Sequence, residues 1–258
     1  MAKSLRESLL ATSPQPRIIP YVTLGDPPDG RFEAWVDELL DGGSFALEVG
    51  LPSSGANEGP VLLRSHERAL RAGLTEIQIL DRLATTVRRI RCPVIAVVHF
   101  RAGMGNDIGR VIEALAETGV AAVLCVGLPV YALPELAEAA RQSDVETVLS
   151  VHGEMPERLR ETVYRAASGC IYLSRRRMVT MSEAEESALC RMVSAETSLP
   201  VIVGTGIRDA ETVTRFVRAG ARACAVGTAL IEKWERRLRD APDASSSFAD
   251  DVRALSNG

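Results

Sequence analysis

PVIAVVHF, residues 93–100, is a nearly continuous apolar run of strand length. Segments with helical periodicity lie on both sides of it in the chain, at residues 75–91 and 108–117. A strand that is apolar on both faces is typical of a parallel sheet covered on both sides by helices. We therefore expect an α/β fold in which strands and helices alternate.

The same alternation continues along the chain. Further strand-like runs lie at residues 17–23, 45–50, 121–126, 146–151, 170–173, 201–203 and 221–226. Eight strand–helix units in 258 residues are typical of a (β/α)8 TIM barrel. A doubly wound sheet is the competing fold, but it would need a glycine-rich dinucleotide-binding turn that the sequence lacks. No linker interrupts the pattern, so we expect one domain over residues 1–258, with an N-terminal arm or helix at 1–15 and a polar tail at 241–258. Residues 248–255 within this tail are a candidate for one more short helix.

Composition indicates an ordinary globular protein, with 46% hydrophobic and 25% charged residues. The longest apolar stretches are strand-sized and the N-terminus lacks a signal-peptide pattern, so we expect a cytoplasmic protein without a membrane segment. A net charge of −4 argues against nucleic acid as a general partner. The five cysteines lack CxxC spacing, which favours reduced, buried thiols.

Lysines are almost absent from this chain. Of 30 basic residues only Lys3 and Lys233 are lysines, the first at the N-terminus and the second in what looks like the last helix. Schiff-base catalysis needs a lysine amine in the pocket. If the chain is an aldolase-type enzyme, we expect it to work without a lysine imine.

Glu48 interrupts the apolar run FALEVGLP, residues 45–52, and a second acid, Glu58, follows in the next loop. A carboxylate at the end of a buried strand is costly unless it is solvated, paired or used. A structural ion pair and a catalytic role are equally good readings of Glu48 at this point. In a barrel, however, the carboxyl ends of the strands build the active site.

Other polar residues are predicted at the same end of the barrel. Tyr21 ends the first strand, His99 and Arg101 end the third, and His152 ends the fifth. His99 and His152 lack the spacing of metal ligands, so we expect no metal and no cofactor. His66 is interpreted as a surface or packing residue.

Glycines follow the last two strands. The candidate phosphate-binding residues are Gly204, Thr205 and Gly206 after the seventh strand, and Gly227 and Thr228 after the eighth. Loops of this kind, each followed by a helix N-terminus, bind phosphate in many barrels. The alternative is that the glycines only form tight turns.

Several segments together resemble a known family. They are PYVTLGDP (20–27), LEVGLP (47–52), EGP (58–60) with RALRAG (68–73), VGTGI (203–207) and VGTA (226–229). Over nearly its whole length the chain resembles the α subunit of tryptophan synthase, which cleaves indole-3-glycerol phosphate to indole and glyceraldehyde 3-phosphate. The resemblance implies that Glu48 is the acid/base that moves a proton at indole C3, and that Glu58 takes the place of an aspartate near the indole N–H. It also implies that Tyr21, His99, Arg101 and Thr180 contact the substrate.

The chain departs from that family at several positions. Glu58 is one methylene longer than the family's aspartate, in a loop one residue shorter. His99 stands in place of an indole-pocket tyrosine, and Met181 in place of a glycine in the lid beside Thr180. Gly127 replaces an aspartate that contacts the family's β subunit, so a β-like partner is possible but its interface is weakened.

Three readings follow from this comparison. The first is a carbon–carbon lyase acting on indole-3-glycerol phosphate or a close analogue, as in tryptophan biosynthesis. The second is a secondary-metabolic enzyme with the same scaffold and a different phosphorylated substrate. The third is a non-catalytic subunit that binds a phosphorylated ligand or a partner chain.

Overall fold

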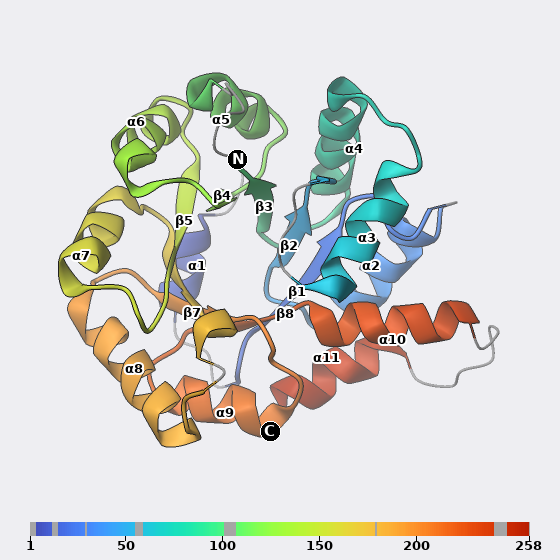
Figure 1. Cartoon of the computed structure of the whole chain (residues 1–258). Helices are drawn as coiled ribbons and strands as arrows, with labels where there is room; N and C mark the ends of the chain where they lie inside the picture. The colour runs from blue at the N-terminus through green and yellow to red at the C-terminus, as the bar shows by residue number, and fades with distance from the viewer. Residues whose placement is uncertain are drawn as a thin grey trace.

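A computed structural model describes residues 4–11, 15–28, 30–54, 59–100, 107–178, 180–239 and 247–257. Eight parallel strands form a closed barrel in which each strand pairs with the next and β8 pairs with β1 (Figure 1). The strands are β1 (Ile18–Thr23), β2 (Leu47–Gly50), β3 (Val94–His99), β4 (Ala122–Val126), β5 (Glu146–Val151), β6 (Cys170–Ser174), β7 (Val201–Gly204) and β8 (Ala223–Val226). The predicted (β/α)8 fold is confirmed.

Helices form an outer layer around the barrel (Figure 1). The α-helices are α1 (Leu5–Leu10), α2 (Arg31–Asp41), α3 (Pro60–Leu70), α4 (Glu76–Arg89), α5 (Ile108–Glu117), α6 (Leu133–Gln142), α7 (Glu157–Ala166), α8 (Glu183–Glu196), α9 (Ala210–Arg218), α10 (Thr228–Arg239) and α11 (Phe248–Ser256). Two 3-10 turns, η1 (Val130–Ala132) and η2 (Arg175–Arg177), follow β4 and β6. The predicted start of the helix after residue 75 is confirmed, because Thr75 forms a capping box with Gln78.

The N-terminal end of the barrel is closed by α1. Leu5 and Leu9 are fully buried, so this short helix packs its apolar face inward. Glu146, the first residue of β5, accepts a hydrogen bond from Ser4 Oγ at 2.6 Å and another from the Arg6 backbone N–H at 2.9 Å. With this end covered, the opposite end of the barrel is left for a site.

The C-terminal helix α11 belongs to the packed structure. Phe248 and Val252 are fully buried, and the Phe248 ring lies 5.7 Å from the Trp35 ring and 5.8 Å from the Trp234 ring, centre to centre. Gly42 allows the approach, because a Cβ there would lie 2.7 Å from Val252 Cβ. Trp35 and Trp234 also stack on each other, 5.5 Å between ring centres, so both have a packing role. The segment expected as a polar tail therefore contains a helix that joins α2 to α10.

An ion pair fixes the end of β1 against α3. Asp26, which is fully buried, accepts hydrogen bonds from Arg68 Nε and Nη2, both at 2.7 Å. Arg68 Nη1 also donates to Glu235 on α10 at 2.6 Å. Residues 26 and 68 lie in two of the segments that carry the family resemblance. The ion pair gives both residues a structural role.

Across the ranges described above, no helix has both the length and the apolar character needed to cross a membrane.

Candidate active site

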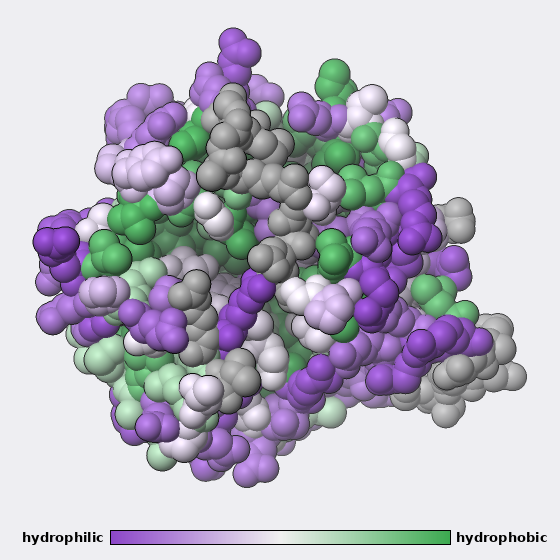
Figure 2. Space-filling model, viewed as in Figure 1, coloured by the Kyte–Doolittle hydropathy of each residue, from purple (hydrophilic) through white to green (hydrophobic). Residues whose placement is uncertain are grey.

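A cavity of about 510 Å³ opens among the carboxyl ends of the strands. Every strand except β7 contributes a lining residue directly, and the loop after β7 contributes two more. These residues are Tyr21, Glu48, Val97, Leu124, Ser150, Tyr172, Ala225, Thr205 and Gly206. The space-filling view shows the hollow, with hydrophobic side chains gathered along one side of it (Figure 2).

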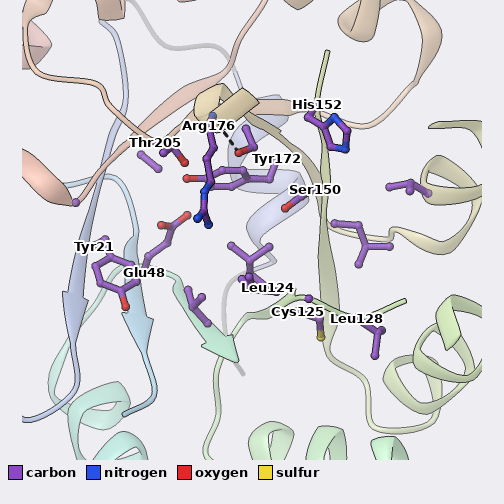
Figure 3. A pocket seen from close by; sticks show the side chains of 18 of the residues that line it. Tyr21, Glu48, Leu124, Cys125, Leu128, Ser150, His152, Tyr172, Arg176 and Thr205 are labelled. Carbon is purple, nitrogen blue, oxygen red and sulfur yellow. Dashed lines mark hydrogen bonds between the residues drawn. The ribbon is translucent and has the colours of Figure 1, made fainter. Parts of the chain in front are cut away.

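Glu48 is the acid that the sequence singled out, and its side chain extends into this cavity (Figure 3). It is only 3% exposed and lies between the fully buried Leu47 and Val49. In the β1–β2 ladder Glu48 pairs with Tyr21, so both side chains project toward the interior of the barrel. The strand period therefore places this carboxylate inside the cavity.

Arg176 on η2 lines the same cavity, and its guanidinium points toward the Glu48 carboxylate (Figure 3). Its backbone N–H donates to Ser174 Oγ at 3.4 Å, which shapes the turn that carries the side chain. A nearby cation offsets the cost of holding a carboxylate away from water. The sequence places the arginine run 175–177 at this end of the barrel and predicts that one of its side chains faces solvent or pairs with a glutamate at 183, 185 or 186. Arg175 does pair with Glu186, but periodicity cannot say which side chain of the run turns inward.

The two glycine loops also face the cavity. Thr205, Gly206, Gly227 and Thr228 line it, and Thr228 is the first residue of α10, so a helix N-terminus begins at the wall. Thr205 and Gly206 are both left-handed, with φ of 72° and 75°. This conformation costs a β-branched residue about 1–3 kcal/mol, and such strain gathers at ligand sites.

Gly204, the remaining predicted phosphate residue, does not line the cavity among the described residues. A Cβ built on Gly204 would lie 1.7 Å from the hydroxyl oxygen of Tyr172. Gly50 has the same relation to Tyr21, with 1.9 Å between the added Cβ and the hydroxyl. Two glycines at strand ends thus make room for two cavity tyrosines.

Behind Tyr21 lies His66, which is fully buried. Ser53 donates its backbone N–H to His66 Nδ1 at 3.1 Å, so we assign the ring proton to Nε2, which lies 2.9 Å from the Tyr21 hydroxyl. The ring of His99 meets that of His66 edge-on, 5.3 Å between centres. His66 therefore connects the cavity wall to the loop after β2, a role that its helical position in the sequence did not reveal.

The remaining predicted substrate contacts are placed differently. His99 packs on His66 and is not among the described residues that line the cavity. Thr180 is exposed and likewise does not line it. Glu58 and Arg101 lie outside the described residues.

Gly127, at the position where the family carries an aspartate, is left-handed with φ of 80°. A Cβ at this residue would lie 2.7 Å from the backbone carbonyl oxygen of Phe100. The backbone here accepts glycine and excludes an aspartate unless the end of β3 moves. The local backbone conformation therefore requires glycine at position 127.

Cys125 lines the cavity, but burial raises the pKa of its thiol to about 12, so it is protonated near neutral pH. His152 also lines the cavity, on the wall formed by β5 (Figure 3). Within the described ranges, no three His, Cys, Asp or Glu side chains gather as a metal site would require. Carboxylate acid/base chemistry is what the cavity offers.

A family model and individual relatives of similar sequence indicate the same protein family. The family model described as "Tryptophan synthase alpha chain" matches residues 9–257. The tryptophan synthase alpha chain of Aromatoleum aromaticum is 32% identical over 247 residues, covering 92% of this chain and 89% of that protein. That of Laribacter hongkongensis is 30% identical over 254 residues, covering 96% of each.

Solved structures share the fold. Tryptophan synthase subunit alpha from Legionella pneumophila has a TM-score of 0.86 at 21% identity, covering 99% of this chain and 97% of that one. The chain from the tryptophan synthase α2β2 complex of Pyrococcus furiosus has a TM-score of 0.78 at 24% identity, covering 93% and 97%. Sequence and fold agree, and this chain belongs to the tryptophan synthase alpha chain family.

Proposed function

We propose that this chain cleaves indole-3-glycerol phosphate to indole and glyceraldehyde 3-phosphate, with Glu48 as the proton-transfer group. The observation that carries the proposal is the shared cavity: a buried carboxylate and two glycine loops open into one space. A substrate with an aromatic ring at one end and a phosphate at the other matches that arrangement.

Proton transfer by Glu48 accounts for the bond cleavage without an imine. The Glu48 carboxylic acid gives its proton to indole C3, which makes the ring electron-deficient. The bond from C3 to the glycerol carbon then breaks, and its electron pair restores the indole ring. The hydroxyl on that glycerol carbon becomes the aldehyde and returns its proton to Glu48, so the enzyme ends as it began.

Phosphate binding is assigned to the loops after β7 and β8. Gly206 and Gly227 leave backbone amides accessible, and the N-terminus of α10 at Thr228 adds a favourable dipole. Glu58 is assigned the role of the family's second acid, near the indole N–H. Its extra methylene matches a loop that is one residue shorter.

The direct test is incubation of the purified protein with indole-3-glycerol phosphate, with indole and glyceraldehyde 3-phosphate measured by chromatography. The proposal predicts equal amounts of the two products. Binding of the substrate without either product would support a non-catalytic subunit. A different phosphorylated product would support another substrate.

A β-like partner is also part of the proposal. Relatives in the solved structures include the Pyrococcus furiosus α2β2 complex, which supports a partner of that kind. Gly127 in place of the family's aspartate predicts a weaker interface. Co-purification with the tryptophan synthase β chain of the same organism tests whether the partner binds. Separate elution of the two chains at micromolar concentration would contradict the proposed partnership.

A further inference from the structure

Arg175 lies beside the loop after β7. Its Nη1 donates to the backbone carbonyl of Gly206 at 2.9 Å, whereas Gly206 itself lines the cavity. Arg175 is not among the described lining residues, and its side chain is 20% exposed. Arg175 therefore contacts the loop without being one of the described residues that line the cavity.

The other nitrogens of Arg175 bind Glu186 on α8. Nε and Nη2 donate to the two carboxylate oxygens at 3.0 and 3.2 Å. Glu186 is 4% exposed and accepts a further hydrogen bond from Arg215 Nη2 at 2.8 Å. Both guanidiniums lie over the Phe216 ring, at 5.4 Å for Arg175 and 4.6 Å for Arg215. Arg175 is thus clamped in place by charge and by stacking.

The loop needs such a restraint. Thr205 and Gly206 are consecutive left-handed residues, and threonine keeps this conformation only where its surroundings enforce it. The bond to the Gly206 carbonyl orients that peptide, and in a trans peptide the N–H of the next residue points the opposite way, away from Arg175. Fixing the carbonyl therefore fixes the direction of an amide at the edge of the cavity.

We propose that Arg175 is a positioning residue for phosphate: it holds the Thr205–Gly206 turn in the shape that binds the anion, without touching the anion itself. Three of its five N–H donors bind protein groups, and Arg175 does not line the cavity among the described residues, so we assign it orientation of the loop. This inference rests on the proposed function, because it assigns phosphate to the same loop.

The test removes Arg175 without leaving Glu186 as an unpaired buried charge. The reference is Glu186→Gln, the test protein is Arg175→Met with Glu186→Gln, and the matched control is Arg215→Met with Glu186→Gln. Arg215 shares Glu186 and Phe216 with Arg175 but donates to Glu183 and Ser187 rather than to Gly206. Only the test protein loses the bond to the loop.

We expect the test protein to bind glycerol 3-phosphate at least tenfold more weakly than the reference, measured by calorimetry. Its KM for indole-3-glycerol phosphate should rise by a similar factor, with kcat within threefold. The Arg215 control should stay within threefold in all three quantities. Equal losses in test and control, or unchanged affinity in the test protein, would overturn the inference.

Arg175→Lys provides a second variant in which the fold is easier to keep. A single ammonium nitrogen can pair with Glu186 but cannot reach the Gly206 carbonyl at the same time, so we expect a raised KM and an unchanged melting temperature. A wild-type KM would overturn the inference. The affinity for glycerol 3-phosphate can be measured without turnover. A wild-type protein that forms no indole would therefore contradict the proposed function, whereas the ratio of affinities between the reference and the test protein would still decide the role of Arg175.

Discussion

The guanidinium of Arg176 points toward the carboxylate of Glu48 across the cavity (Figure 3). The two side chains come from different units of the barrel, η2 after β6 and the strand β2. The positive charge of Arg176 therefore lies near the carboxylate of Glu48, the group proposed to transfer the proton.

Replacing Arg176 should therefore harm catalysis more than stability. We expect Arg176→Gln to lower kcat/KM at least tenfold, equivalent to about 1.4 kcal/mol, because charge-assisted contacts are lost from the cavity. Arg176→Lys should recover part of the loss. The exposed Arg165 at the end of α7 provides the control, and an Arg176→Gln protein as active as Arg165→Gln would refute the role.

Gly204 should resist any side chain, because a Cβ would lie 1.7 Å from the Tyr172 hydroxyl oxygen. We expect Gly204→Ala to lower the free energy of unfolding by about 1–3 kcal/mol, as overpacking does. Gly109→Ala is the comparison, since there the nearest atom is 3.1 Å away, on the flexible side chain of Asp107. It should stay within about 1 kcal/mol of wild type in urea unfolding. Equal effects of the two substitutions would count against the close contact.

Tyr21 and His66 should be energetically coupled, since their side-chain atoms lie 2.9 Å apart in a buried site. Tyr21→Phe should cost about 1 kcal/mol, and His66→Leu more, because Ser53 also loses its acceptor. A double-mutant cycle should give a coupling of about 1 kcal/mol. Strictly additive effects on unfolding would show that the hydrogen bond contributes nothing.

Glu196 should make stability depend on pH in the acid range. Hydrogen bonds from Arg160, at 2.8 and 2.6 Å, and from Tyr164 at 2.8 Å lower the pKa of this carboxyl, with Arg160 the larger cause. Because the folded pKa lies below the unfolded value of about 4.3, the contribution is complete above that pH and is lost as pH falls through the folded value. The difference in urea midpoint between wild type and Glu196→Gln should be full at pH 7 and shrink below pH 4. A difference at pH 3 as large as that at pH 7 would contradict this assignment.

The barrel and the place of Glu48 could be predicted because both depend on local patterns. The apolar run at 93–100 and its repeats determine strands and helices, and the strand period puts Glu48 on the interior face. The glycines at 206 and 227 also follow from their place after the last two strands. These features need no knowledge of distant contacts.

Contacts between distant segments were not predictable in the same way. His66 reads as one more helical residue until Tyr21 and Ser53 are brought to it. The position of Gly204 after a strand places it in a predicted phosphate loop, but its contact with Tyr172 cannot be predicted from the sequence. Helix α11 gains its buried face only from α2 and α10, far away in the sequence.

The central claim, proton transfer by Glu48, is tested most directly by Glu48→Gln, which keeps the shape of the side chain and removes its proton chemistry. Indole release from indole-3-glycerol phosphate should fall by at least a thousandfold, while the affinity for glycerol 3-phosphate stays within threefold of wild type. A Glu48→Gln protein that releases indole at the wild-type rate would contradict the account.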